Sequence, residues 1–268
     1  MANIHPTAIV DAHANISDDV YIGPYCTVGP DVTLGEGTKL ISHVVVTGCT
    51  TMGKRNTVYP FAAIGTLAQH KRSNAPDAKL IIGDDNTFRE HVTAHVGSDV
   101  DNKITIIGNR NLFLVASHIA HDCVLGDDIV MSNNATLAGH VHVEDKAIIG
   151  GLSAVLQFCR IGKGAMIGGM SGVCQDVIPY GIVMGGGRGN GLDGLNLVGL
   201  RRAGVDNQLI FGLQKAYKEL FLTPDKSFNE RVELVENNEA YRNNPLVQDI
   251  ITFVKNPSKY NILQPEKA

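Results

Sequence analysis

The sequence contains no tryptophan, and only 6% of its 268 residues are aromatic. Few large side chains can therefore fill its interior, and the core must consist mainly of small aliphatic residues. Glycine is frequent, at 29 residues, which indicates many tight turns. Hydrophobic residues still make up 44% and charged residues 19%, so the composition is that of an ordinary folded protein.

Other features are also missing, and each absence excludes a class of protein. The net charge is −4 and the isoelectric point about 6.2, so nucleic acid is not an expected partner. No apolar run reaches the roughly 18 residues of a membrane span, and the N-terminus lacks the pattern of a secretory signal. The five cysteines are odd in number and lack C-x-x-C spacing. We therefore expect reduced thiols and a cytoplasmic protein.

An apolar residue recurs at every sixth position over most of the chain. The series runs from Ile16 to Ile64, returns at Ile82, and continues in a shifted register from Ile107 to Val173. An α-helix cannot carry this pattern, because its period of 3.6 residues does not divide six. A hexapeptide solenoid can: each unit is a short strand and a turn, and three units form one coil of a mainly β, parallel β-helix. Glycine often follows the aliphatic residue, and we interpret these glycines as turn positions with positive φ.

Two segments interrupt the repeat, at residues 65–80 and 97–103. A solenoid accommodates such insertions as surface loops, and loops of this kind are often functional. The first carries Lys71 and Arg72, which favour contact with a ligand or partner over a neutral insertion.

The repeat ends near Pro179, and beyond it apolar residues recur at helical spacing. Ser227 and Glu230 match the capping box of one of these helices. We therefore divide the chain into a β-helix, residues 1–188, and a small α-helical C-terminal domain, residues 189–268. The helices are expected to cap the open end of the solenoid.

Histidines cluster in the later repeats, at His118, His121, His140 and His142. Because one coil is three units of six, residues 18 apart should stack on adjacent coils. His121, Gly139 and Gln157 have this spacing and are predicted to form one column, with steps of about 4.8 Å. Asp122 follows His121, and His140 lies beside Gly139.

This column has the groups needed for acyl transfer. His121 could accept a proton from a substrate hydroxyl or amine, and the Gly139 N–H could stabilise the oxyanion formed on a thioester carbonyl. Outward histidines on a solenoid can also be simply solvated, which leaves a non-catalytic binding protein as an alternative. A zinc site of His118, His121 and His140 is another, but no further matching ligand is evident and we expect no metal.

Several segments resemble the UDP-N-acetylglucosamine acyltransferases of lipid A synthesis: Ser117–Cys123 (SHIAHDC), Asn133–Val141 (NNATLAGHV), Gln157–Cys159 (QFC) and Ile167–Val173 (IGGMSGV). The likeness spans almost the whole chain. It implies a left-handed β-helix and a homotrimer with active sites between subunits. It also implies a 3-hydroxyacyl donor on acyl carrier protein, with its phosphopantetheine and no other cofactor, and a UDP-sugar acceptor acylated at its 3-position.

The resemblance also assigns roles by matching position. His121 would be the general base, Asp122 its partner and Gly139 the oxyanion donor. The implied substrate-binding residues are His70, Arg72, His118, His140, Gln157, Gly169, Arg188, Asn196 and Arg202. Among them Gly169 would end the acyl groove and leave room for a long chain.

Four positions depart from the family pattern: His70, Leu156, Arg188 and Val198. The family usually has Asp, His, His and Glu at these places. All four fall in the region expected to bind the nucleotide sugar, whereas the catalytic column is intact. An alternative function is therefore N-acylation of a 3-amino nucleotide sugar, such as the 3-amino analogue of UDP-GlcNAc.

Overall fold

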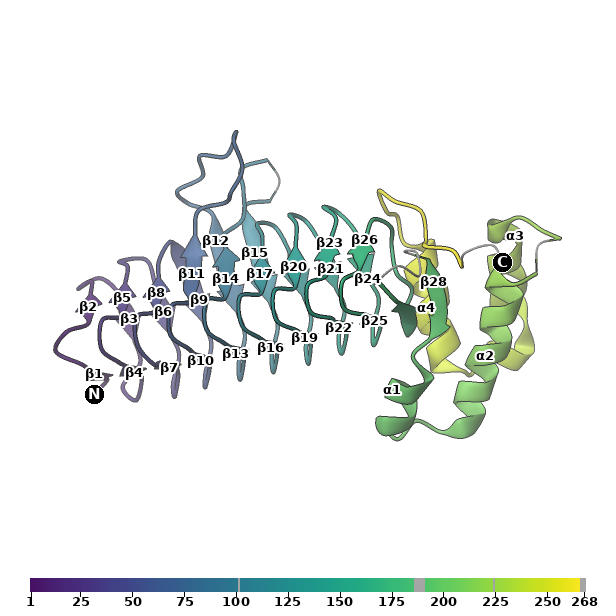
Figure 1. The fold of residues 1–268 in the computed structure, drawn as a ribbon, viewed down its shortest axis with the longest axis horizontal. Coiled ribbons are helices and arrows are strands. Elements are labelled where there is room, and N and C mark those ends of the chain that lie inside the picture. The colour runs from purple at the N-terminus through teal and green to yellow at the C-terminus, as the bar shows by residue number, and fades with distance from the viewer. Residues whose placement is uncertain (101, 186–190, 224, 266–268) are drawn as a thin grey trace.

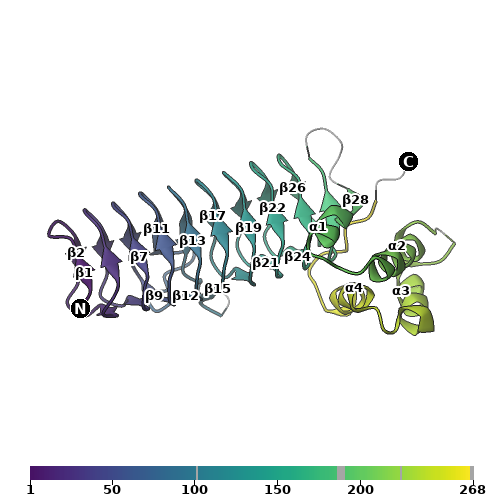
Figure 2. The ribbon, with the colours of Figure 1, turned by 90° about the horizontal axis from the view of Figure 1, so that it is seen from below.

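The computed structural model describes residues 1–100, 102–185, 191–223 and 225–265. The chain winds as a solenoid of short strands, and helices gather at one end (Figure 1, Figure 2). The strands fall into three sheets of 11, 9 and 8 strands, which we call sheets A, B and C. Nearly all pairings are parallel, so the predicted mainly β, parallel solenoid followed by helices is confirmed.

The strands of sheet A are β1 (Asn3–Ile4), β4 (Tyr21–Ile22), β7 (Lys39–Leu40), β10 (Thr57–Val58), β13 (Thr87–Phe88), β16 (Leu112–Phe113), β19 (Val130–Met131), β22 (Ile148–Ile149), β25 (Met166–Ile167), β27 (Gly181–Val183) and β28 (Leu192–Leu195). Those of sheet B are β2 (Ile9–Val10), β5 (Thr27–Val28), β8 (Val45–Val46), β11 (Ala63–Thr66), β14 (Thr93–His95), β17 (His118–Ile119), β20 (Thr136–Leu137), β23 (Ala154–Val155) and β26 (Gly172–Val173). Those of sheet C are β3 (Asn15–Ile16), β6 (Thr33–Leu34), β9 (Cys49–Met52), β12 (Lys79–Ile82), β15 (Ile104–Ile107), β18 (Val124–Leu125), β21 (His142–Val143) and β24 (Arg160–Ile161).

The six-residue repeat accounts for the core. Successive apolar positions, such as Leu34, Leu40 and Val46, fall on sheets C, A and B in turn and are fully buried. The predicted inward positions from Ile22 to Val173 are all buried, and only Ile16 in the first coil is partly exposed. The sequence period therefore predicts the burial pattern correctly, because each coil rests on the next in constant register.

The interpretation of the repeated glycines was wrong at all but one position. Gly65 has positive φ, whereas the other glycines that follow the aliphatic residue, such as Gly23 and Gly108, do not. A Cβ at Gly23 would lie 1.8 Å from the Ile41 carbonyl oxygen, and one at Gly108 would lie 2.5 Å from the Gly126 oxygen. These positions exclude a side chain because the backbone of the next coil approaches closely. The left-handed corner positions are mostly non-glycine residues, including Asp122 and His140.

A buried ladder of asparagines keeps the coils in register across the two insertions. The Asn86 N–H donates to Asn56 Oδ1 and the Asn111 N–H donates to Asn86 Oδ1, both at 2.9 Å. These partners are 30 and 25 residues apart, because the intervening coils carry the extra loops. Each side-chain amide also donates to a carbonyl of the next coil, as Asn86 does to Gly108 at 2.9 Å. The ladder therefore satisfies buried polar groups across both interruptions.

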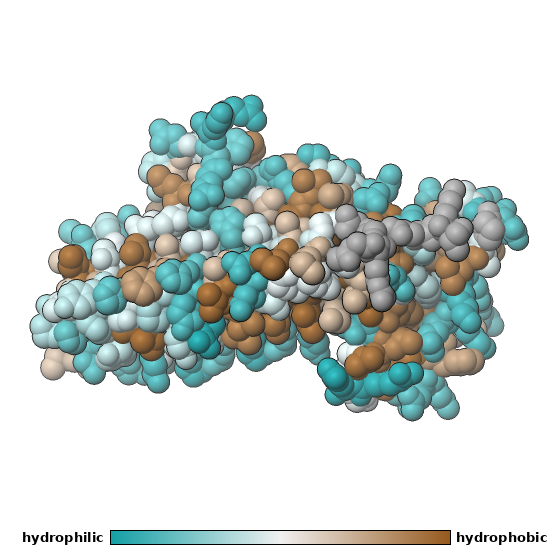
Figure 3. All heavy atoms as spheres, in the orientation of Figure 1, coloured by the Kyte–Doolittle hydropathy of each residue, from teal (hydrophilic) through white to brown (hydrophobic). Residues whose placement is uncertain are grey.

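The first loop is shorter than the predicted segment 65–80, and the second begins one residue before the predicted segment 97–103. The first connects β11 to β12 and spans residues 67–78, because the flanking strands extend to Thr66 and begin again at Lys79. The second connects β14 to β15 over residues 96–103. Both loops project from the solenoid (Figure 1), and the surface of this projection is largely hydrophilic (Figure 3).

The C-terminal elements are α1 (Leu197–Arg202), α2 (Asn207–Phe221), α3 (Phe228–Asn237), a 3₁₀ turn (Glu239–Tyr241) and α4 (Pro245–Lys255). The capping box of Ser227 and Glu230 is present at the start of α3. No helix among the described residues has the length and apolar character needed to cross a membrane.

The last coils are covered by the chain that follows them. β28 pairs antiparallel with β27, and Asp176 forms a bridge with Ile262 near the C-terminus. Tyr180 of the last coil also donates a hydrogen bond to Asp249 of α4. The predicted domain boundary between residues 188 and 189 lies outside the described residues.

Candidate active site

Both loops and the predicted catalytic turn leave the solenoid at the same corner. The loops connect sheet B to sheet C in two successive coils, and residues 120–123 make the same connection, from β17 to β18, in the coil after them. The loops therefore stand beside the turn that carries His121 and Asp122. This placement makes the corner between sheets B and C the candidate site.

The predicted column is present at this corner. His118 pairs with Thr136, and Thr136 with Ala154, so the following turns lie in register on adjacent coils. His121, Gly139 and Gln157 each begin such a turn, as the 18-residue spacing predicts. The turns are linked by hydrogen bonds: the His140 N–H donates to the His121 carbonyl oxygen at 3.0 Å, and the Phe158 N–H donates to that of Gly139 at 3.1 Å.

His121 and Asp122 form a buried pair. His121 Nδ1 lies 2.8 Å from Asp122 Oδ2, and the carboxylate is fully buried. Burial would raise the pKa of Asp122, but hydrogen bonds from His121 and Ser98 outweigh it and leave this pKa below its usual value. The carboxylate therefore stays ionised near neutral pH and holds a proton on Nδ1, which leaves Nε2 as the proton acceptor.

His140 extends this pair towards the next coil. Its Nε2 lies 3.6 Å from Asp122 Oδ2, and its ring centroid lies 5.2 Å from that of His121. On the other side the His140 ring stacks on Phe158 at 4.5 Å, and Lys259 Nζ lies 3.6 Å from the centre of the Phe158 ring. The imidazole of His140 thus lies between the hydrogen-bonded His121–Asp122 pair and the Phe158 ring, and the Lys259 ammonium lies on Phe158.

Gly139 is in contact with the imidazole of His121. A Cβ at Gly139 would lie 2.5 Å from His121 Cε1 and 2.8 Å from Nε2, so only glycine fits against the ring. No hydrogen bond joins the Gly139 N–H to another of the described residues. The turn thus places an N–H donor beside the imidazole, as the sequence predicts.

The first loop brings His70 onto His121. The two rings meet edge to face with centroids 5.5 Å apart. His70 Nδ1 also accepts a hydrogen bond from the Arg72 N–H at 3.3 Å, and the Arg72 side chain is exposed beside it. The loop that carries one of the four departures therefore forms part of the site.

Two more histidines lie on sheet B beside the column. His118 Nδ1 lies 2.7 Å from Thr93 Oγ1, and its ring meets that of His95 at 5.0 Å. Burial lowers the pKa of His95 to about 4, with a further contribution from the neighbouring His118 and His121, and burial also lowers the pKa of His118. Both imidazoles are therefore neutral at pH 7. Sequence reasoning missed His95, because it directly follows the core residue Ala94 and resembles part of a strand.

The remaining predicted residues lie elsewhere in the chain. Gly169 is exposed in a turn between sheets A and B, at a different corner of the solenoid. Asn196 caps α1 and donates to the Gly164 carbonyl oxygen at 3.1 Å, and Arg202 is exposed in the last turn of α1. Arg188 lies outside the described residues. Within one chain, His70 and His140 contact His121, His118 lies on the strand before it, and Gln157 lies in the same column, whereas Gly169, Asn196 and Arg202 lie at other places. The departures Leu156 and Val198 are exposed.

Comparison with known proteins decides the family. A family model described as "Udp N-acetylglucosamine O-acyltransferase; Domain 2" matches residues 176–262, and one for "Bacterial transferase hexapeptide (six repeats)" matches residues 13–48. The acyl-[acyl-carrier-protein]--UDP-N-acetylglucosamine O-acyltransferase of Sinorhizobium fredii is 44% identical over 267 residues, which cover 100% of this chain and 97% of the relative. The chain belongs to the UDP-N-acetylglucosamine O-acyltransferase family.

Other relatives and solved structures of this acyltransferase family agree. The enzyme of the same name from Agrobacterium fabrum is 42% identical, with 100% of this chain and 97% of the relative covered. The crystal structure of the UDP-N-acetylglucosamine O-acyltransferase of Moraxella catarrhalis has a TM-score of 0.91 at 40% identity and covers 97% of this chain and 99% of its own. The crystal structure of the Francisella novicida enzyme has a TM-score of 0.93 at 33% identity, and the match covers 98% of this chain and 95% of that one. The chain is therefore an enzyme, and the non-catalytic alternative is not favoured.

The site of this acyltransferase also contains a group of side chains that could hold a metal ion. His121, Asp122 and His140 offer ligand atoms within 4.8 Å of one another. The zinc site considered from the sequence consisted of His118, His121 and His140. The group in the structure contains Asp122 in place of His118. His121 Nδ1 and Asp122 Oδ2 are, however, hydrogen-bonded to each other, which satisfies these atoms without an ion. The expectation that the enzyme needs no metal stays a prediction.

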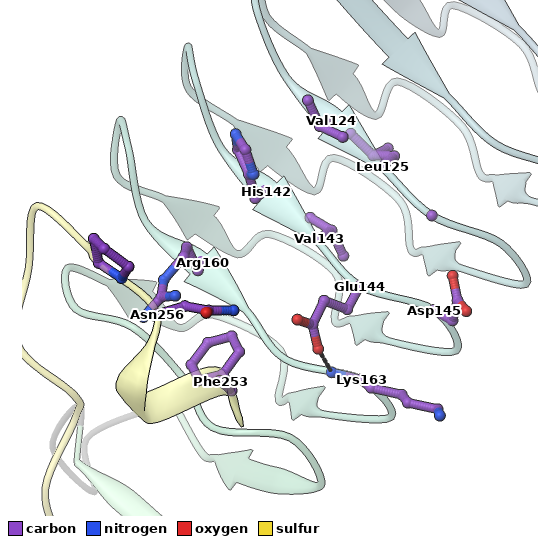
Figure 4. A pocket seen from close by; sticks show the side chains of 12 residues that line it. Val124, Leu125, His142, Val143, Glu144, Asp145, Arg160, Lys163, Phe253 and Asn256 are labelled. Atoms are coloured by element: carbon purple, nitrogen blue, oxygen red, sulfur yellow. Dashed lines mark hydrogen bonds between the residues drawn. The ribbon is translucent and has the colours of Figure 1, made fainter. Parts of the chain in front are cut away.

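A separate cleft of about 570 Å³ lies between sheet C and the end of α4 (Figure 4). Val124, His142, Arg160 and Phe253 line it, but the column residues do not. Arg160 stacks on Phe253 at 4.3 Å and is paired with Asp176 at 2.7 Å. Its charge is therefore neutralised within the chain, and the cleft is not the candidate active site.

The lowered pKa of Asp122 predicts how its contribution to stability depends on pH. A carboxyl group with a lowered folded-state pKa stabilises the fold above its unfolded pKa, and this stabilisation is lost as pH falls through the folded pKa. Asp122→Asn should therefore lower the free energy of unfolding at pH 7 by about 1.5–3 kcal/mol, as for hydrogen bonds to a charged group. The difference from wild type should shrink below about pH 4, where an ordinary Asp is itself protonated.

Urea unfolding of both proteins at several pH values would measure this difference. Asp31→Asn, at an exposed carboxylate, is the matched control and should unfold like wild type. A deficit for Asp122→Asn that stays constant down to low pH would contradict the assignment.

Proposed function

We propose that the enzyme transfers a 3-hydroxyacyl chain from acyl carrier protein to the 3-hydroxyl group of UDP-GlcNAc, the first step of lipid A biosynthesis. The observation that carries this proposal is the buried His121–Asp122 pair beside the N–H of Gly139. The names of the relatives support the donor and acceptor, since they are called acyl-[acyl-carrier-protein]--UDP-N-acetylglucosamine O-acyltransferases.

The reaction follows from the chemistry of these three residues. Nε2 of His121 accepts the proton of the sugar hydroxyl while its oxygen attacks the thioester carbonyl. The Gly139 N–H donates to the developing oxyanion, and Asp122 stabilises the imidazolium. Collapse of the tetrahedral intermediate breaks the C–S bond, and the imidazolium returns the proton to the phosphopantetheine sulfur. No covalent acyl-enzyme is needed, and Cys123 is unsuited to nucleophilic attack because burial raises its pKa to about 12.

The remaining substrate contacts are assigned to the loops and to a neighbouring subunit. His70 and His140 contact His121, His118 lies on the strand before it, and Gln157 lies in the same column; these four residues would line the sugar site. Arg72 is exposed on the first loop and would attract an acidic carrier protein together with Lys71. In the proposed homotrimer, Gly169, Arg188, Asn196 and Arg202 would reach the site of an adjacent subunit. We place the enzyme in the cytoplasm, since all five cysteines are free thiols.

An acyl-transfer assay with 3-hydroxyacyl carrier protein tests this function. UDP-GlcNAc and its 3-amino analogue are offered in parallel to the purified full chain. We expect turnover of UDP-GlcNAc, and the names of the relatives do not favour the amino sugar. Turnover of the amino sugar alone would overturn the hydroxyl acceptor and assign the changes at His70, Leu156, Arg188 and Val198 to a new substrate. If neither UDP-GlcNAc nor its 3-amino analogue is acylated, the proposal is overturned.

A further inference from the structure

The second loop begins with a residue that reaches the catalytic pair. Val96, Gly97 and Ser98 are buried, whereas Asp99 and Val100 are exposed at the loop surface. Ser98 is fully buried, and its Oγ donates to Asp122 Oδ2 at 2.6 Å. Its backbone N–H donates to Asp122 Oδ1 at 3.0 Å. One residue of the insertion therefore holds both oxygens of the carboxylate.

The base of this loop is tightly fixed. The Gly97 N–H donates to the Lys79 carbonyl oxygen at 3.1 Å, and a Cβ at Gly97 would lie 2.0 Å from the Ile104 nitrogen. The two ends of the loop thus pass so closely that only glycine fits between them. Ser98 follows directly, so its position is set by the closure of the loop and not by its exposed tip.

The other end of the loop leads to a second contact with Asp122. Thr105, fully buried on β15, accepts a hydrogen bond from the Asp122 N–H at 2.8 Å. Thr105 therefore fixes the main chain of Asp122, and Ser98 fixes its side chain. Oδ2 of the carboxylate receives two donors, His121 Nδ1 at 2.8 Å and Ser98 Oγ at 2.6 Å.

We propose that Ser98 is a positioning residue for the general base, so that Ser98, Asp122 and His121 act as one hydrogen-bonded relay. The second insertion serves to deliver this hydroxyl group to the carboxylate. This inference rests on the proposed function, in which His121 accepts the substrate proton. By donating to the same oxygen, Oδ2, that accepts from His121 Nδ1, the hydroxyl keeps Asp122 ionised and directed at Nδ1, and it thereby directs Nε2 at the substrate.

Loss of the hydroxyl has two expected effects on the full-length enzyme. In Ser98→Ala, kcat should fall roughly 10- to 100-fold, the range for one lost hydrogen bond to a charged group, while KM for UDP-GlcNAc changes little. The acidic limb of the pH–rate profile should move to higher pH, because a carboxylate with one donor fewer holds the imidazolium proton more strongly. The other titratable groups facing this pair, His70, His95, His118 and His140, are unchanged in the variant.

Two further variants separate positioning from folding. Ser98→Thr keeps the hydroxyl and should recover most of the lost kcat. Ser153→Ala is the matched control, because Ser153 is also buried and donates one hydrogen bond, to the Gly168 carbonyl oxygen at 2.7 Å, at a different corner. It should leave kcat and the pH profile unchanged. A Ser98→Ala enzyme with wild-type kcat, or one whose kcat falls without any shift of the pH profile or rescue by threonine, overturns the inference.

A measurement without substrate distinguishes this failure from failure of the proposed function. The imidazole of His121 can be titrated by NMR in histidine-labelled wild type and Ser98→Ala. If wild type does not acylate UDP-GlcNAc, the proposed function fails, but a titration midpoint that moves to higher pH in the variant still supports the relay. An unchanged midpoint overturns the relay whatever the enzyme acylates.

Discussion

Replacing His121 by alanine should lower kcat by about 10²- to 10⁴-fold, the contribution expected of a positioned general base. The imidazole lies against Gly139, so its proton acceptor adjoins the Gly139 N–H, and Asp122 is oriented to stabilise its charged form. KM for UDP-GlcNAc should change much less, because the proton is transferred in the transition state and not on binding. Steady-state acyl transfer with 3-hydroxyacyl carrier protein measures both constants.

His13→Ala provides the control for this variant. His13 lies in the first coil, where it is exposed and hydrogen-bonded to Asp11, far along the solenoid from the column. Both variants should keep the circular dichroism spectrum and the melting temperature of a folded solenoid. If His121→Ala is folded and transfers acyl chains at the wild-type rate, His121 is not the base and the mechanism proposed above is wrong.

Replacing Gly139 by alanine should lower kcat by about 100-fold, as expected when a reacting group is displaced by about 1 Å. The new methyl group would lie 2.5 Å from His121 Cε1, closer than any tolerated contact. The backbone on the other side is fixed by the stacked coils, so the imidazole has to move. The N–H donor of residue 139 remains in the variant, and the loss therefore reports the position of the ring.

Gly29→Ala is a matched change in an early coil. A Cβ there would lie 3.3 Å from Thr47 Oγ1, a contact that a small side-chain movement relieves, and φ is not positive. It should leave kcat unchanged. A Gly139→Ala enzyme with wild-type kcat would show that His121 is not held against this glycine during the reaction.

Much of this fold could be predicted because a solenoid is nearly one-dimensional. Each residue faces the residue one coil away, so spacing in the sequence becomes spacing in the structure. One coil consists of three hexapeptides, and residues separated by that length therefore stack on adjacent coils. This spacing correctly predicted that His121, Gly139 and Gln157 form one column. The burial of the aliphatic positions follows from the same rule.

The parts that could not be predicted lie where the period fails. Ser98 and His70 belong to the loops, whose residues have no fixed offset from the column. Their contacts depend on how each loop closes, which the six-residue pattern does not describe. The family resemblance named His70, but the six-residue period did not place it against His121. Most of the repeated glycines were misinterpreted for a related reason, because the close backbone of the next coil requires glycine there and their own dihedral angles do not.

The asparagine ladder has a consequence for how this site can change. Because Asn56, Asn86 and Asn111 carry the register across the insertions, the coils do not depend on loop length. Residues can be added to or removed from a loop tip without a slip that would turn the core side chains outward. The ladder thus makes substrate choice independent of the fold. The loops beside His121 can change in sequence and length while the coils that position His121 keep their structure.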